Sequence, residues 1–223
     1  MLKNLVFLLT LFLVNSVTFG QDTEKYKMNW QNFSQLVEVN KEIDLKNPDF
    51  QLLNLAIFQA TNKFRIQEKL SPFQYDVSLE KAANGHSNDM INLNFIDHFN
   101  TQVSSKKSPD LRIKLESKSF VMMAENVAQL DVLNLTNNQY CYEPQQNGGY
   151  IFFDCNTKKL LKPLSYWALA TKLVTLWINS PGHRANMLDA KLVFLGCGSA
   201  FSQQAFKTNK PPFCRATQNF GSK

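Results

Sequence analysis

The chain has 223 residues, 44% of them hydrophobic, and a formal net charge of +6. This length accommodates one good-sized domain with additions and does not require two. The lysines are scattered and arginines are few, unlike the concentrated basic face of a nucleic-acid-binding domain, so that class of function is excluded.

The first 20 residues have the pattern of a secretory signal peptide. Lys3 precedes an apolar run from Leu5 to Val14, and small and polar residues follow as far as Gly20. The run is too short to cross a bilayer, and no other stretch of the sequence comes close. We therefore expect cleavage near Gly20 and a secreted protein, extracellular or periplasmic, without a transmembrane segment.

The next residues, 21–48, have weak periodicity and are predicted to form an N-terminal arm. From Asp49, which is placed as an N-cap, apolar residues recur at helical spacing as far as Phe64. A second helix is expected to begin with Ser78 as its cap and to carry His86 on its apolar face. We assign residues 49–223, after the arm, to one main domain.

A polar loop is predicted after the second helix, followed by a strand over residues 120–130 that is interrupted by Glu125. Residues near 131–163 are less regular and are predicted to be an insert. Gly148 and Gly149 lie between two apolar runs there, which indicates a hairpin.

The last third is predicted to contain a helix over residues 164–179 and a short helix that Ser180 and Pro181 begin. Two strand-like runs follow, at 192–201 and 213–220, and should pair as a hairpin. Strands and helices do not alternate as in βαβ units, so the predicted fold class is α+β.

Four cysteines form an even set in a chain predicted to be exported, which favours two disulfides over metal thiolates. Three connectivities are possible. We predict Cys141–Cys155 and Cys197–Cys214, because each pair brackets an expected hairpin.

The sequence contains three histidines. His86, on an apolar helix face, is more typical of a hydrogen-bonded core residue, whereas His98 lies in a loop and His183 in a first helical turn. Glu125 either points to solvent or is buried and paired, and periodicity does not decide between these. Two imidazoles and a carboxylate suit Zn²⁺, although their spacing matches no local metal motif. No nucleophile motif of the GxSxG type is present.

Several stretches, in this order, resemble the CAP superfamily of cysteine-rich secretory, antigen 5 and pathogenesis-related 1 proteins. They are YDVSLEKAANGHSNDM with NFIDHF, MAENVA, LWINSPGHRANMLDAKLVFLGCGSA and RATQNFG. The sequence is similar above all to the bacterial SCP-like extracellular branch. The resemblance spans about Phe50 to Gly221 without the insert, and SPGHRANML followed by a glycine-alternating strand is its most specific part.

The resemblance implies an α-β-α sandwich with a central antiparallel sheet and a cleft lined by two histidines and acidic residues. By position, His98 and His183 match the cleft histidines and Glu125 matches the glutamate of a GEN motif, with Ala124 in place of its glycine. Ser180 lies near the place where animal members carry a second glutamate. Three of the usual four polar residues are therefore expected in the cleft.

Family members have been linked to lipid or sterol binding, to cell-surface interaction and, in places, to proteolysis, and a fold alone does not select among these. We expect a secreted, monomeric binding protein for a lipid, a glycan or a cell-surface protein. His98, Glu125 and His183 would hold a divalent metal, with Zn²⁺ as the candidate. The alternative is a zinc-assisted hydrolase with Glu125 as general base. A third interpretation is a cell-envelope interaction module in which the cleft is incidental.

Overall fold

The computed structural model describes residues 21–135, 139–146, 148–203 and 205–223, so the predicted signal peptide lies outside the described part. Within these ranges, no helix combines the length and apolar character needed to cross a membrane.

A four-stranded sheet in the order β1-β5-β6-β2 forms the middle layer. The strands β2 (Met122–Asp131), β5 (Phe194–Phe201) and β6 (Phe213–Ser222) are antiparallel. The short β1 (Gln74–Tyr75) runs parallel to β5 at the other edge. The predicted antiparallel centre is confirmed. The sequence of β1 reads as a turn because two residues are too few to show alternation.

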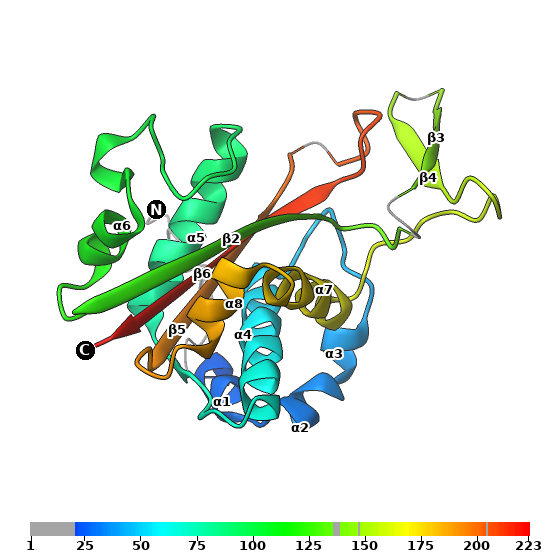
Figure 1. The fold of residues 1–223 in the computed structure, drawn as a ribbon. Helices are drawn as coiled ribbons and strands as arrows, with labels where there is room; N and C mark the ends of the chain where they lie inside the picture. The colour runs from blue at the N-terminus through cyan, green and yellow to red at the C-terminus, as the bar shows by residue number, and fades with distance from the viewer. Residues whose placement is uncertain (1–20, 136–138, 147, 204) are drawn as a thin grey trace, which may run out of the picture.

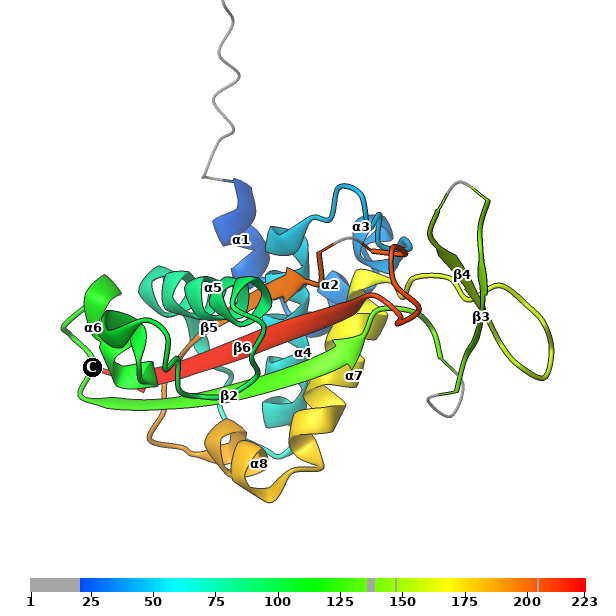
Figure 2. The ribbon, with the colours of Figure 1, turned by 90° about the horizontal axis from the view of Figure 1, so that it is seen from above.

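Helices cover both faces of the sheet, as Figure 2 shows. On one face lie α4 (Phe50–Gln67), α7 (Tyr166–Ile178) and α8 (Pro181–Leu188), and on the other α5 (Val77–Asn92) and α6 (Pro109–Glu116). This arrangement confirms the expected α+β class and the α-β-α sandwich. The helix α6 and the 3-10 turn Ser104–Lys106 occur where the sequence predicted a loop.

The alternating glycines of β5 allow α5 to approach the sheet closely. A Cβ atom on Gly198 would collide with backbone atoms of Ala83 and Asn84, and one on Gly196 with those of Glu80. These glycines therefore serve helix–sheet packing. They bring α5, which carries His86, directly against the sheet.

Capping side chains explain where two of the helices begin, and a proline explains a third. The Asp49 carboxylate accepts a hydrogen bond from the backbone N–H of Leu52 at 2.9 Å, as expected of an N-cap. Asp76, not the predicted Ser78, caps α5. Ser180 stands at the N-cap position of α8 but its side chain makes no capping bond, so Pro181 carries the start signal there.

The arm folds into the short helices α1 (Gln21–Lys27), α2 (Trp30–Ser34) and α3 (Val37–Asn40). These lie against α4 and α7 (Figure 1). Phe33 and Val39 are completely buried, so the arm contributes to the same hydrophobic core as the sheet and its helices.

The insert forms a hairpin of β3 (Cys141–Pro144) and β4 (Tyr150–Phe153), which projects from the three layers (Figure 1). The predicted disulfide Cys141–Cys155 is present, with its Cα atoms 5.1 Å apart. A bridge between Leu133 and Pro163 closes the base of the insert. The excursion therefore leaves and returns at neighbouring points.

The second predicted disulfide is wrong. Cys197 and Cys214 are free and buried. In the β5–β6 register Cys197 faces Gln218 and Cys214 faces Phe201, so the two cysteines are four positions out of register. That offset is about 13 Å along a strand, whereas a disulfide needs Cα atoms about 4.4–6.8 Å apart. The cysteines bracket the hairpin without occupying paired positions. Burial raises the pKa of both thiols.

Candidate functional site

The edge strand β2 lies at the centre of the site because its side chains alternate between the two helical layers. Glu125 points toward α5 and α6, where its contacts lie. The next residue, Asn126, points to the opposite layer and donates to the backbone oxygen of His183 in α8 at 3.1 Å. Two adjacent residues of one strand thus connect both sides of the sandwich.

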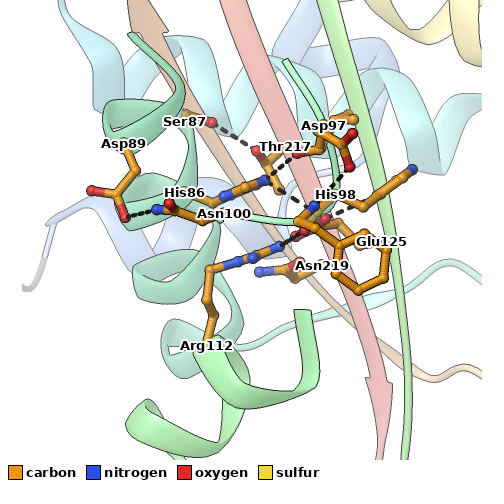
Figure 3. Close-up of polar contacts among 12 residues, drawn as sticks. His86, Ser87, Asp89, Asp97, His98, Asn100, Arg112, Glu125, Thr217 and Asn219 are labelled. Atoms are coloured by element: carbon orange, nitrogen blue, oxygen red, sulfur yellow. Dashed lines mark hydrogen bonds and ion pairs between the residues drawn. The ribbon is translucent and has the colours of Figure 1, made fainter. Parts of the chain in front are cut away.

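Glu125 is buried, with only 1% of its side chain exposed. Its Oε2 lies 2.6 Å from Nη2 of Arg112, and its Oε1 accepts a hydrogen bond from Nδ1 of His98 at 3.0 Å (Figure 3). The Asn219 amide, turned so that both of its polar atoms are satisfied, also donates to Oε2 at 3.1 Å. The buried, paired alternative for Glu125 is therefore correct.

Arg112, from α6, fixes more than the carboxylate. Its Nη2 also donates to the backbone oxygen of His98 at 3.0 Å, and its Nη1 donates to that of Lys106 at 2.9 Å. One guanidinium thus ties the loop that carries His98 to β2. The sequence carries no signal of this role, because a lone arginine in a polar segment resembles a surface side chain.

His86 is the core residue that its position on the helix predicts. It is fully buried, and its Nε2 lies 2.9 Å from the backbone oxygen of Asp97. Since a carbonyl only accepts, Nε2 carries the proton. Burial lowers the pKa of His86, against the opposing effect of Glu125, whose Oε1 is 3.8 Å away.

His98 and His183 come from opposite layers and meet across the edge strand, with their ring centroids 6.1 Å apart. The hydrogen bond to Glu125 raises the pKa of His98, whose side chain is 38% exposed. Burial, followed by the charge of His98, lowers the pKa of His183. Because Nδ1 of His98 is hydrogen-bonded to Glu125, Nε2 is the ring nitrogen of His98 that is available to a ligand.

A hollow of about 440 Å³ opens beside His98. Asp110 contributes an acidic group to it that has no distinct signal in the sequence, since the segment around it reads as a polar loop. Its carboxylate accepts a hydrogen bond from Ser108, which lowers the pKa of Asp110, and pairs with Lys114 at 3.3 Å. The hollow is lined by His98, Phe99, Pro109, Asp110, Met123, Ala124 and Glu125.

The profile of the cysteine-rich secretory protein family, CAP, matches residues 58–217. The chain belongs to this family. Among curated proteins it is similar to the uncharacterized protein YkwD of Bacillus subtilis, with 26% identity over 142 residues, 64% of this chain and 40% of YkwD. The chain therefore spans less than half the length of that relative.

Two solved structures are similar to this CAP domain. One is an extracellular protein containing an SCP domain from Bacillus anthracis, with 22% identity and a TM-score of 0.48 over 77% of this chain and 40% of that one. The other is an outer surface protein from Borrelia burgdorferi, with 16% identity and a TM-score of 0.49 over 82% of this chain and 98% of that one.

The match begins within α4, so the arm and its three helices precede the part of the CAP domain that the family profile covers. The three residues expected to bind a metal all lie inside the match. Glu125 and His98 are hydrogen-bonded, and the ring centroid of His183 lies 6.1 Å from that of His98.

The donor set does not fit a zinc centre with three protein ligands. The described residues include no group of three or more histidines, cysteines or acidic residues placed to hold a metal. Both carboxylate oxygens of Glu125 already face donors, and this residue holds the imidazole of His98 in place. Two imidazoles remain as candidate donors of this CAP domain.

Proposed function

We propose that this CAP-family chain is a secreted, non-catalytic binding protein whose ligand contacts His98 and His183 across the edge strand. The observation that carries the proposal is the state of Glu125. Its two oxygens are held by His98 and Arg112, and its side chain is 1% exposed. The carboxylate therefore organises the cleft from below, while the two imidazoles face the ligand.

The same contacts weaken the alternative of a zinc-assisted hydrolase. A general base must reach the proton that it removes, directly or through one water molecule. Arg112 and His98 occupy the oxygens with which Glu125 would do so. A metal-activated water would also need an ion that more than two imidazoles hold.

The imidazoles indicate the chemistry of the ligand. When protonated, His98 donates to Glu125 through Nδ1 and can offer a second N–H at Nε2. This favours an acceptor group such as a phosphate or carboxylate, which a lipid headgroup, a glycan or a cell-surface protein can supply. When both histidines are neutral, their imidazoles can instead share a weakly bound divalent ion. This binding stays a prediction.

Export is part of the proposal. It is supported by the signal-peptide pattern of residues 1–20, by the disulfide Cys141–Cys155 and by the secretory description of the family. Disulfides persist in oxidising compartments outside the cytosol.

The binding test uses the three imidazole resonances of the purified mature protein. Titration with inorganic phosphate near pH 6 should shift the Cε1–H signals of His98 and His183 and leave that of buried His86 in place. If all three signals stay unmoved with phosphate and with acetate, the proposed contact with an acceptor group is wrong.

Hydrolysis is tested separately with dye-labelled casein in the presence and absence of Zn²⁺. The wild type should release no more dye than a His98→Ala/His183→Ala variant. If the wild type releases dye and the Glu125→Gln variant does not, the result would favour the hydrolase.

A further inference from the structure

A second cavity, of about 570 Å³, lies away from the histidines, between the arm, α4 and the segment that leads into β1. Figure 1 shows α1 and α2 against one end of α4. We call the cavity beside them the arm pocket. Its volume falls within the range of small-molecule sites, about 300–1,000 Å³. Residues 26–30 supply one wall, and they precede the part of the chain that the family profile matches.

Two buried amide side chains of α4 fix the walls. Gln59 donates through Nε2 to the backbone oxygens of Lys25 and Met28, at 3.0 and 3.1 Å. Asn62 both donates to the backbone oxygen of Phe73 and accepts from its N–H, at 3.0 and 2.7 Å. Both amides are less than 10% exposed. The arm and the segment before β1 are thus each tied to the same helix, and the pocket between them is preformed.

The aromatic part of this lining is equally constrained. The rings of Tyr26 and Tyr75 stack with their centroids 3.7 Å apart, and the Tyr26 hydroxyl donates to Glu80. Phe73 lies beneath the guanidinium of Arg65 at 3.8 Å. These contacts hold Tyr26, Phe73 and Tyr75 in place along the lining. Flat apolar walls of this kind suit an aromatic ring.

Trp30 supplies a hydrogen-bond donor that has no acceptor in the described part of the chain. It lines the pocket, and its indole Nε1 is buried without a hydrogen-bond partner among the described residues. A buried indole N–H normally has an acceptor. The ammonium of Lys63 lies 4.9 Å from the Trp30 ring but outside the pocket lining. Lys27 is part of the lining, which makes an acceptor with negative charge favourable there.

We propose that the arm pocket is a second binding site, for a small aromatic molecule that carries an anionic acceptor for the Trp30 N–H. The arm pocket is separate from His98 and His183 and does not depend on the function proposed for those two residues. Apolar walls provide most of the contact area, and the indole donor sets the orientation, as in small-molecule sites generally.

The test uses 1-anilinonaphthalene-8-sulfonate, an aromatic anion, added to the folded mature protein in a fluorescence titration. The wild type should bind it saturably at one site. Trp30→Phe keeps the ring and removes the donor, so its affinity should fall about tenfold, as for loss of a hydrogen bond to a charged group. Trp167→Phe, the same change on α7 outside the pocket, should bind like the wild type.

A second variant tests the cavity itself. Ile66 lines the pocket and is 44% exposed, so Ile66→Trp should fill the pocket without disturbing the core and abolish saturable binding. His98→Ala should bind the dye normally. Unchanged binding in both Trp30→Phe and Ile66→Trp, or no saturable binding by the wild type, would overturn the proposal.

Discussion

Arg112 and Glu125 form an ion pair with a separation of 2.6 Å in which the side chains are 2% and 1% exposed. Such a pair contributes little net stability, but removing one partner leaves an uncompensated buried charge. The pair therefore fixes the geometry beneath His98.

Arg112→Met should destabilise the protein by about 3–5 kcal/mol, because Glu125 would be left charged and buried. Urea denaturation measures this. The matched control is Arg184→Met, since Arg184 pairs with Glu68 at the surface, where both are 39% exposed. It should cost less than about 1 kcal/mol. The double variant Arg112→Met/Glu125→Leu should recover stability, and equal costs for Arg112→Met and Arg184→Met would contradict the buried pair.

The histidines should titrate in different directions from the ordinary value of 6.5, His98 above it and His86 below it. His98 therefore contributes stability that is fully present below pH 6.5 and is lost as the pH rises through its folded-state pKa. His86 contributes stability that is present above pH 6.5 and is lost as the pH falls through its folded-state pKa.

NMR titration of the three Cε1–H signals measures these values. Glu125→Gln removes the largest cause of the His98 shift, so the pKa of His98 should fall in that variant. A pKa of His98 that stays where it was would show that Glu125 does not set it.

The unfolded, unreduced protein should expose two reactive thiols, Cys197 and Cys214, since only Cys141 and Cys155 are bonded. A thiol reagent such as DTNB counts them in guanidinium. In the native protein both should react slowly, because they are buried and burial raises their pKa. A denatured protein without reactive thiols would mean that a second disulfide exists.

Zn²⁺ should bind weakly, well short of the about 10–16 kcal/mol of structural zinc sites, because two imidazoles supply fewer ligands than zinc sites normally have. Calorimetry should show that binding is lost in His98→Ala and in His183→Ala and is kept in His86→Gln. Affinity should fall at acid pH as the imidazoles become protonated. If the double variant His98→Ala/His183→Ala binds Zn²⁺ with the affinity of the wild type, the ion binds at another place.

Gly198→Ala should destabilise the fold by about 1–3 kcal/mol or more, because the new methyl group meets the backbone of α5. Gly182→Ala is the control, since nothing lies within 4 Å of its Cβ position in α8. It should be neutral or stabilising by up to about 1 kcal/mol. Thermal unfolding compares the two, and similar melting temperatures would show that α5 does not pack as closely as described.

Local patterns predicted the helices that carry a clear apolar face. The Asp49 cap and the apolar period after it predicted α4, and the Ser180–Pro181 pair predicted α8. The helix α6 was missed because it has eight residues and buries only Arg112 and Ile113, too few for a visible period. The same brevity hid Arg112, whose burial depends on pairing with Glu125, 13 residues further along the chain on β2.

The sequence by itself determined the α+β class, the family, the stapled hairpin and the three candidate residues of the cleft, because these rest on local periodicity, turn residues and motif order. The tertiary structure decided that Glu125 is clamped between Arg112 and His98, that Cys197 and Cys214 stay apart, and that the arm builds a pocket. Strand register, and the packing of segments distant in sequence, set each of these. Neither leaves a local signal, since a shift along a strand changes every partner without changing the composition.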